Sequence, residues 1–218
     1  HLDIDHSGGA RSLLNTLPVD WMLTSVFADA DIVAVARSRG VTPIACVRGQ
    51  SWQWDGVRFE VLHPDAGNYS EARLKTNDRS CVIKVRSASF SALLTADIEA
   101  LSERMLVERY AGQPDALHSD VLLIPHHGSL TSSTPAFIAA VAPKLALINA
   151  GYRNRFGHPR DTVLARYHAR SIDVLRTDWH GAIMLDSVSG VAGVRKYRDL
   201  RRRYWLDRPD PADGRPLE

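Results

Sequence analysis

The sequence predicts an α/β fold with a polar site at the ends of its strands. Apolar segments of strand length alternate with segments whose apolar residues recur at helical spacing, which is typical of layered α/β proteins. Several predicted strands run directly into Asp or His, as at Asp97 and His126. The first nine residues also concentrate His, Asp and Gly in one short segment. Together these observations place polar chemistry at one edge of a sheet.

The composition is that of an ordinary globular domain. The chain has 218 residues, of which 44% are hydrophobic and 24% charged, enough for one substantial core. The net charge of +2 does not by itself indicate a nucleic-acid partner. No apolar run reaches the length of a membrane span, and no secretory signal is present. Basic residues gather near the C-terminus: Arg195, Lys196, Arg198, Arg201, Arg202 and Arg203.

The chain starts on His1, inside a motif, so we expect it to be part of a longer protein. Its two cysteines, Cys46 and Cys81, are too few for a disulfide framework. They would pair if the domain lies outside the cytoplasm, or remain as two buried thiols.

In the first half of the chain, residues 10–17 repeat apolar side chains at helical spacing and stop before Pro18. A helix there leaves the His/Asp cluster in a strand-to-helix loop. Residues 57–62 alternate apolar and polar side chains, as a half-buried strand does. Residues 65–79 are polar, which predicts an irregular loop. The other predicted elements are a helix at 31–39 and strands at 21–27, 41–47 and 52–54.

In the second half, a hairpin is predicted from residues 81–85 and 90–94, followed by an amphipathic helix at 99–110. Pro135 at a first helical position favours a helix at 134–141, and Asp161 is expected to cap a helix through residue 170. We assign residues 1–206 to one domain and expect residues 207–218 to be a disordered tail. Further strands are predicted at 120–124, 144–150 and 173–176, with a closing hairpin from 182–185 and 191–196.

The N-terminal segment carries the densest group of candidate ligands. His1, Asp3, Asp5 and His6 lie within six residues, and two glycines that allow a sharp bend follow closely. Imidazoles and carboxylates together suit divalent zinc, manganese or iron. The alternative is a solvated polar turn.

Further candidates follow the later strands. Asp97 stands between a strand and a helix, so it is either a helix N-cap or a site residue. His126 and His127 are adjacent, and because successive side chains diverge, at least one should face a polar site. His158 could ligate a metal, donate a proton or bind phosphate with neighbouring arginines, and the alternative is an exposed loop histidine.

Other chemistries are less well supported. Neither cysteine is near a histidine in sequence, Ser129 lacks the context of a nucleophile elbow, and no phosphate-binding glycine loop is present. Trp52 and Trp54 could stack on bases, but alternating tryptophans in a strand more often cover the edge of a core.

The motifs carry a family resemblance. The segment His1-x-Asp3-x-Asp5-His6-x-Gly8-Gly9 resembles the His-x-His-x-Asp-His motif of the metallo-β-lactamase superfamily, with Asp3 in place of the second histidine. The whole motif order is similar to that of the C-terminal metallo-β-lactamase-like domain of the ComEC family of bacterial DNA-uptake channel proteins. The other motifs are Gly49-x-x-Trp52-x-Trp54, Asn77-x-x-Ser80-Cys81-Val82, Leu93-Leu94-Thr95-Ala96-Asp97-Ile98-Glu99, Pro125-His126-His127-Gly128-Ser129, Asn154-Arg155-Phe156-Gly157-His158-Pro159 and Arg176-Thr177-Asp178-x-x-Gly181.

The resemblance implies an αββα sandwich whose first strands lie before residue 1, with two divalent ions, manganese or zinc. It implies that Asp97 bridges the ions and that His127, or else His126, completes one site. Asn77 or Asp78 lies near the place of the superfamily's middle histidine. The resemblance assigns His1 and Asp3 to one ion, and Asp5 and His6 to the other.

The resemblance also implies a metal-dependent phosphodiesterase or nuclease that acts on incoming DNA during natural transformation. The implied catalytic residues are Asp5, His126 and His158, and the implied substrate-binding residues are Arg153, Asn154, Arg155 and Ser129. Expected partners are DNA, contacted through its backbone, and the membrane channel portion of the same protein, with no small organic cofactor. The expected location is a soluble, periplasmic domain of an inner-membrane protein. Alternatives are a small-molecule ester or lactone hydrolase and a non-catalytic module that guides DNA.

Overall fold

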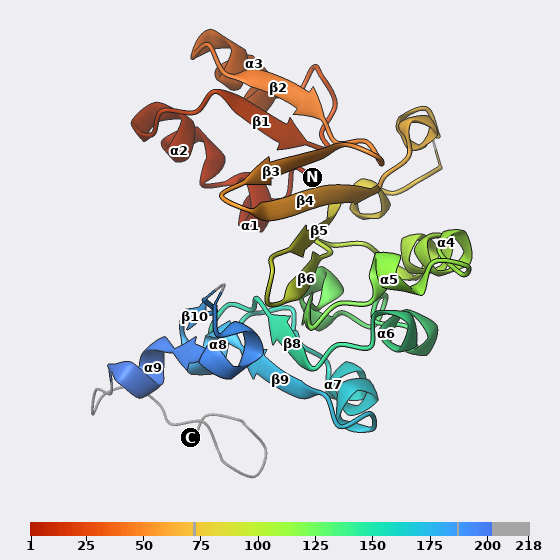
Figure 1. The fold of residues 1–218 in the computed structure, drawn as a ribbon. Coiled ribbons are helices and arrows are strands. Elements are labelled where there is room, and N and C mark those ends of the chain that lie inside the picture. Colours follow the sequence, from red (N-terminus) through yellow and green to blue (C-terminus); the bar gives the residue numbers. More distant parts are fainter. Residues whose placement is uncertain (72, 187, 202–218) are drawn as a thin grey trace.

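A mixed seven-stranded sheet forms the centre of the protein in a computed structural model that describes residues 1–71, 73–186 and 188–201 (Figure 1). Neighbouring strands follow chain order from β3 to β9. The pairs from β3 to β6 are antiparallel, and those from β6 to β9 are parallel. Parallel strands end at one edge, so the segments after β6, β7 and β8 meet there. The strands are β3 (Ser51–Trp54), β4 (Val57–His63), β5 (Val82–Arg86), β6 (Ser91–Leu94), β7 (Val121–Leu123), β8 (Leu145–Ile148) and β9 (Asp173–Arg176).

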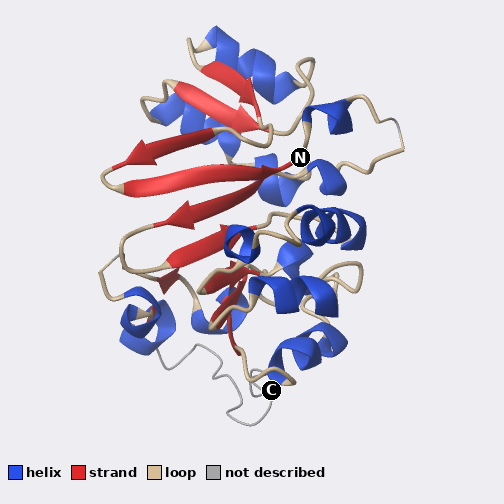
Figure 2. Cartoon of the chain, turned by 45° about the vertical axis from the view of Figure 1, so that its right-hand side comes forward, coloured by secondary structure: helices blue, strands red, loops and turns tan. Residues whose placement is uncertain are grey.

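Helices cover one face of this sheet (Figure 2). The parallel strands follow one another in order, so right-handed crossovers put their connecting helices on the same side. Phe137, Ile138 and Val141 on α6 are fully buried in the core that these helices form with the sheet. The connecting helices are α4 (Ala100–Arg109), α5 (Pro114–Leu117), α6 (Pro135–Val141) and α7 (Asp161–His168).

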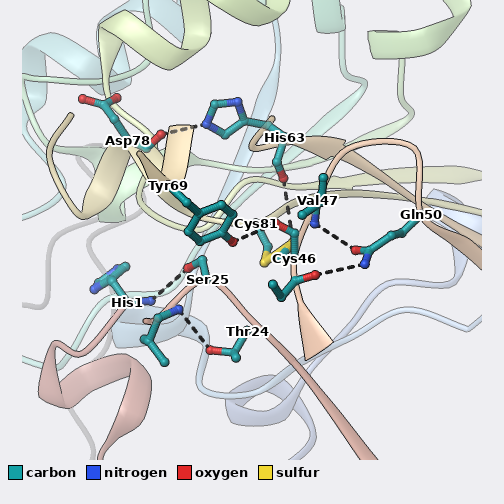
Figure 3. The surroundings of a disulfide bond; sticks show 12 residues. His1, Thr24, Ser25, Cys46, Val47, Gln50, His63, Tyr69, Asp78 and Cys81 are labelled. Carbon is teal, nitrogen blue, oxygen red and sulfur yellow. Dashed lines mark hydrogen bonds between the residues drawn. A yellow bond between two sulfur atoms is a disulfide. The ribbon is translucent and has the colours of Figure 1, made fainter. Parts of the chain in front are cut away.

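The N-terminal part forms a smaller unit beside β3 and β4 (Figure 1). Its parallel strands β1 (Trp21–Thr24) and β2 (Thr42–Ala45) pair with each other, and Leu14, Ala36 and Val41 form its own small core. The disulfide Cys46–Cys81, with 6.0 Å between the two Cα atoms, joins the end of β2 to the start of β5 (Figure 3). Of the two alternatives for the cysteines, the structure shows the paired one. The helices of this unit are α1 (Ile4–Ser7), α2 (Ala10–Thr16) and α3 (Asp31–Ser38).

The C-terminal part of the described chain contributes a short antiparallel pair, β10 (Ile183–Met184) and β11 (Arg195–Lys196). Beside it lie α8 (Thr177–His180) and α9 (Tyr197–Leu200). Within the described residues, no helix has both the length and the apolar character needed to cross a membrane. Over the part of the chain that the structure describes, four short 3-10 segments complete the fold: η1 (Ala66–Tyr69), η2 (Asn77–Arg79), η3 (Pro125–Gly128) and η4 (Gly190–Gly193).

Most predicted elements lie where the periodicity placed them, with four corrections. The predicted loop at the N-terminus contains the helical turn α1, because Asp3 O accepts hydrogen bonds from the amides of His6 and Ser7, both at 2.9 Å. Asp161 is the first residue of α7 and not its cap, which is Arg160. The predicted loop at 65–79 includes η1 and η2, and η4 occupies part of the predicted closing hairpin. The predicted tail at 207–218 and the boundary at 206 lie outside the described residues.

Candidate metal centre

Three imidazoles of the predicted site lie around one buried carboxylate. Asp97, 4% exposed, lies between β6 and α4, after Thr95 and Ala96. The Nε2 atoms of His1 and His6 lie 3.3 Å and 3.2 Å from its Oδ2. On the other side, His127 Nε2 lies 3.6 Å from its Oδ1. The N-cap of α4 is Glu99, so Asp97 is not the helix cap that its position in the sequence allowed.

A second group lies next to the first. Asp5 Oδ2 lies 3.2 Å from His127 Nε2, and His6 Nε2 lies 3.3 Å from the same nitrogen. Two sets of three potential ligand atoms result, each with all its atoms within 4.8 Å of one another. One set is His1, His6 and Asp97, and the other is Asp5, His6 and His127. His6 belongs to both sets, so the two candidate positions adjoin.

The N-terminal segment reaches this position through a tight local structure. The His1 amino group donates to Ser25 Oγ at 3.5 Å, just after β1 (Figure 3). Ser7 Oγ donates back to Leu2 O at 2.9 Å, across the turn α1. A Cβ on Gly8 would lie 2.4 Å from Ile4 O, so only glycine fits where the chain leaves this turn. Gly8 therefore has a steric reason, whereas nothing lies within 4 Å of an added Cβ at Gly9.

The His-His-Gly loop after β7 is held in an uncommon backbone conformation. His126, His127 and Gly128 have φ angles of 50°, 53° and 80°, three consecutive left-handed residues. For a non-glycine residue such a conformation costs on the order of 1 kcal/mol or more. Surrounding contacts hold the loop, since His126 N donates to Ala96 O at 3.1 Å and Ser132 Oγ donates to Pro125 O at 2.8 Å.

The tautomer of His127 follows from its partner. Its Nδ1 lies 2.7 Å from Asn149 O, and a carbonyl oxygen can only accept, so Nδ1 carries the proton. The lone pair of the neutral ring is then on Nε2, the atom that faces Asp5 and Asp97. Metal-binding histidines commonly donate their second ring nitrogen to a backbone carbonyl in this way.

The pKa values of Asp97, His127 and His1 are shifted by the close contacts between this carboxylate and the imidazoles. Burial opposes ionisation of Asp97, but contacts with His1, His127 and His6 hold its pKa far below the usual range. The hydrogen bond with Asp97 raises the pKa of His127 to about 9, against the effect of burial. Burial disfavours the charged form of His1, but Asp97 outweighs it and raises that pKa too.

The residues present fit a divalent cation. Both ring nitrogens of His1 are buried, and neither makes a well-aligned hydrogen bond to any described residue, although Nε2 lies 3.3 Å from Asp97 Oδ2. A buried imidazole without hydrogen bonds is unusual, and a metal ligand of this kind satisfies it. Nitrogen and carboxylate donors together suit zinc or manganese.

Three other candidate ligands, Asp3, Asp78 and Asn77, are not members of either ligand set. Asp3 is 63% exposed at its side chain and outside both sets, with Oδ2 3.7 Å from His1 Nδ1. Asp78 is buried and serves α4, because its Oδ1 accepts from Glu99 N at 3.2 Å and Ser102 Oγ at 2.8 Å. Its backbone oxygen lies 2.7 Å from His63 Nε2 (Figure 3). Asn77 Nδ2 is instead 3.5 Å from His126 Nε2.

His126 and His158 form a second row beside the centre. His126 is outside both ligand sets, and its Nδ1 lies 3.1 Å from Thr131 Oγ1. The ring centroids of His126 and His158 are 6.0 Å apart. The two loops touch directly, since a Cβ on Gly128 would lie 2.6 Å from Pro159 Cβ. Two of the three predicted catalytic residues, His126 and His158, therefore lie together, while the third, Asp5, belongs to a ligand set.

The predicted substrate-binding residues divide into two kinds. Asn154 closes its own loop, with Oδ1 accepting from His158 N at 3.0 Å and Nδ2 donating to His158 O at 2.6 Å. Ser129 is 7% exposed, and its Oγ lies 3.2 Å from Thr131 Oγ1. By contrast, Arg153 and Arg155 are exposed beside His158.

Sequence reasoning gave no role to two residues that contact His126, namely Thr131 and Glu99. Glu99 Oε1 lies 3.8 Å from His126 Nδ1 and 3.4 Å from Asn77 Nδ2. The signal for Glu99 was its place two residues after Asp97, at the end of a recognised motif. Thr131 gave no such signal.

Comparisons with known proteins agree with the family resemblance. No family model matches the chain. It is 38% identical over 160 residues to Competence protein ComA of Neisseria gonorrhoeae, covering 73% of this chain and 22% of that protein. It is 34% identical over 188 residues to ComE operon protein 3 of Bacillus subtilis (strain 168), covering 84% and 23%. The chain thus spans less than a quarter of the length of these relatives.

A solved structure with partial similarity is the metallo-β-lactamase fold protein YhfI from Bacillus subtilis, with 14% identity, 81% of this chain and 71% of that chain covered, and a TM-score of 0.47. A score at that level adds no weight to any assignment of function. The relatives in sequence match the chain over most of its length. The chain therefore belongs to the ComEC family of competence proteins, and its α/β structure with a mixed central sheet is the metallo-β-lactamase fold that its motifs predict.

Proposed function

We propose that the centre around Asp97 binds divalent metal and hydrolyses phosphodiester bonds in DNA. The observation that carries the proposal is the convergence of His1, His6 and His127 on one buried carboxylate. Asp5 adds a second carboxylate to this group. Asp97 is 4% exposed, and a buried carboxylate needs a compensating partner, which a cation held together with the imidazoles would supply.

The proposed roles of the residues follow from their positions. His1, His6 and Asp97 would hold one ion, and Asp5, His6 and His127 would supply ligands for a second. Bound divalent ions lower the pKa of a coordinated water and neutralise phosphate charge. Asp5, the more exposed carboxylate, would orient the attacking water, and His126 would deliver a proton to the leaving oxygen. His158 would contact the phosphate beside His126.

DNA is the substrate that the surroundings favour. One relative is named Competence protein ComA, and Arg153 and Arg155 are exposed on the loop that carries His158. Guanidinium groups at such positions contact phosphates without reading the base sequence. The disulfide Cys46–Cys81 supports a periplasmic placement, because disulfides persist in oxidising compartments. A membrane channel in the remainder of the full-length protein would be the partner that delivers the strand.

The test is cleavage of DNA by the purified protein with added Mn²⁺ or Zn²⁺. We expect metal-dependent cleavage that falls by a factor of roughly 100 or more in Asp97→Ala, since that change removes the shared carboxylate. Asp173→Asn, an exposed carboxylate at the start of β9, is the matched control and should cleave like the unaltered protein. Intact DNA, with the protein and Asp97→Ala behaving alike, would overturn the proposal. A lactone and bis(p-nitrophenyl)phosphate assayed in parallel distinguish a small-molecule hydrolase.

A further inference from the structure

A row of aromatic rings leads from the metal centre to the surface. The ring centroids of His127 and His126 are 6.4 Å apart, and those of His126 and His158 are 6.0 Å apart. Phe156 follows at 6.1 Å from His158, with only 19° between the two ring planes. Phe156 is 59% exposed, so the row ends at the surface.

A positively charged guanidinium lies close to this exposed ring. The guanidinium of Arg155 lies over Phe156, 5.0 Å from its centroid. Among the residues that the structure describes, no carboxylate forms an ion pair with Arg155, so its charge remains available to a phosphate. Together the exposed ring and the guanidinium offer the two groups that a single nucleotide needs. A base can stack on the ring when the flexible Arg155 side chain moves off it, and the guanidinium supplies a cation for the backbone phosphate.

The loop presents Phe156 in a defined position. Asn154 spans the loop with hydrogen bonds to Gly151 O and to both backbone polar groups of His158. Gly157, at a φ of 63°, provides the bend between Phe156 and His158. Arg160 N donates to Gly128 O at 3.0 Å and thereby fixes the loop to the His-His-Gly segment. A ring held in this way loses little conformational entropy when a ligand stacks on it.

We propose that Phe156 is a stacking platform for an unpaired base of the substrate strand, and that it makes the centre prefer single-stranded over double-stranded nucleic acid. The inference rests on the proposed function, since it places this base next to the phosphate that is cleaved. Stacking on one aromatic ring tolerates any base, because every base has a π-face. A base within a duplex is already stacked on both faces and cannot use the platform without unpairing.

The binding test uses fluorescence anisotropy with a labelled phosphorothioate oligothymidylate, which resists cleavage, in the presence of Mn²⁺. Phe156→Leu keeps an apolar side chain but removes the ring, and we expect it to bind this strand about five-fold or more weakly. The same backbone with abasic sites should bind both proteins equally, and so should a duplex of the same length. Phe156→Trp should restore the affinity for oligothymidylate.

The matched control is another exposed aromatic residue. Trp54 is 55% exposed at the turn between β3 and β4, away from the ring row. Trp54→Leu should bind oligothymidylate like the unaltered protein if Phe156 acts through its position. Equal affinity of Phe156→Leu and the unaltered protein for oligothymidylate would overturn the inference, as would an equal loss for the abasic strand.

The outcomes also separate this inference from the proposed function. A protein that cleaves no DNA but shows the base-dependent loss in Phe156→Leu would refute the nuclease and keep the platform. A protein that cleaves DNA, with the same KM for a single strand in Phe156→Leu, would keep the nuclease and refute the platform.

Discussion

His126 and His127 are adjacent in sequence but have different surroundings. His127 Nε2 faces Asp5 and Asp97, while His126 contacts Thr131 and lies beside His158. The left-handed backbone at both residues turns the two side chains apart. A single pair of variants therefore distinguishes metal binding from proton transfer.

We predict that His127→Ala lowers metal affinity by a factor of roughly 10 to 100, the size expected when a ligand or its support is removed. His126→Ala should retain the metal content of the unaltered protein and lose DNA cleavage. Metal analysis by mass spectrometry after dialysis against a range of free Mn²⁺ concentrations measures both. Equal metal loss in the two variants would contradict the assignment.

Gly128 tests the contact between the two site loops. Its φ is 80°, and an added Cβ would lie 2.6 Å from Pro159 Cβ, so Gly128→Ala should destabilise the protein by about 2 to 4 kcal/mol. Gly112→Ala is the control, because nothing lies within 4 Å of an added Cβ there, and it should change stability by less than about 0.5 kcal/mol. Urea unfolding of both variants gives the comparison, and similar stabilities for the two would contradict the prediction.

At the scale of elements, Asp120 ties three strands together at the start of β7. Its Oδ2 accepts from Ser91 N at 2.9 Å, at the start of β6, and its Oδ1 accepts from Lys144 Nζ at 2.8 Å, before β8. Burial opposes ionisation, but the hydrogen bonds from Lys144 and Ser91 outweigh it and lower the pKa of Asp120 to about 2. The carboxylate is thus stabilising only while ionised.

This shift gives stability a defined pH dependence. The folded pKa lies below the unfolded value of 3.8, so the contribution is full above about pH 4 and is lost as the pH falls toward 2. Between pH 5 and pH 3 the protein should lose about 1 kcal/mol through this group. Asp120→Asn should lack that part of the loss, as measured by urea unfolding at both pH values. Parallel losses in the two proteins would show that Asp120 does not titrate in this way.

The sequence predicted the positions of helices and strands better than the contacts of individual site residues. Helix signals are local, whereas those contacts join distant parts of the chain. Pro135 and the apolar spacing of α6 are local signals, and the helix lies where they placed it, with Thr134 Oγ1 accepting from Phe137 N as its cap. Asp97 could be taken as a cap on local grounds alone, because only the parallel order of β6 and β7 brings His127 to it. The partners of Asp78 across the chain, at the start of α4, have no local signature either.

At the scale of the whole molecule, the disulfide Cys46–Cys81 joins the unit that carries His1 and His6 to the sheet that carries Asp97 and His127. It closes a segment with a sequence separation of 35, for which the loop-closure model gives about 3 to 4 kcal/mol. Asn77, on η2 just before Cys81, lies with its Nδ2 3.5 Å from His126 Nε2, so the disulfide is also close in sequence to a residue that contacts the site.

We predict that reduction with dithiothreitol lowers the midpoint of thermal unfolding by several degrees and weakens Mn²⁺ binding, because the two units can then separate. The variant with Cys46→Ser and Cys81→Ser should match the reduced protein and not respond to dithiothreitol. Calorimetry and metal titration measure the two effects. An unchanged midpoint on reduction would mean that packing alone holds the units together.

The two ligand sets also draw on distant parts of the chain, because His6 and His127 are 121 positions apart. An unfolded chain cannot hold such atoms together, so a cation that binds here distinguishes the folded state from all others. By thermodynamic linkage, each tenfold rise in free metal above its dissociation constant should add about 1.4 kcal/mol to the free energy of unfolding. Ions that take part in the proposed hydrolysis would then also stabilise the entire fold. The free energy of unfolding would increase with the free metal concentration in the compartment.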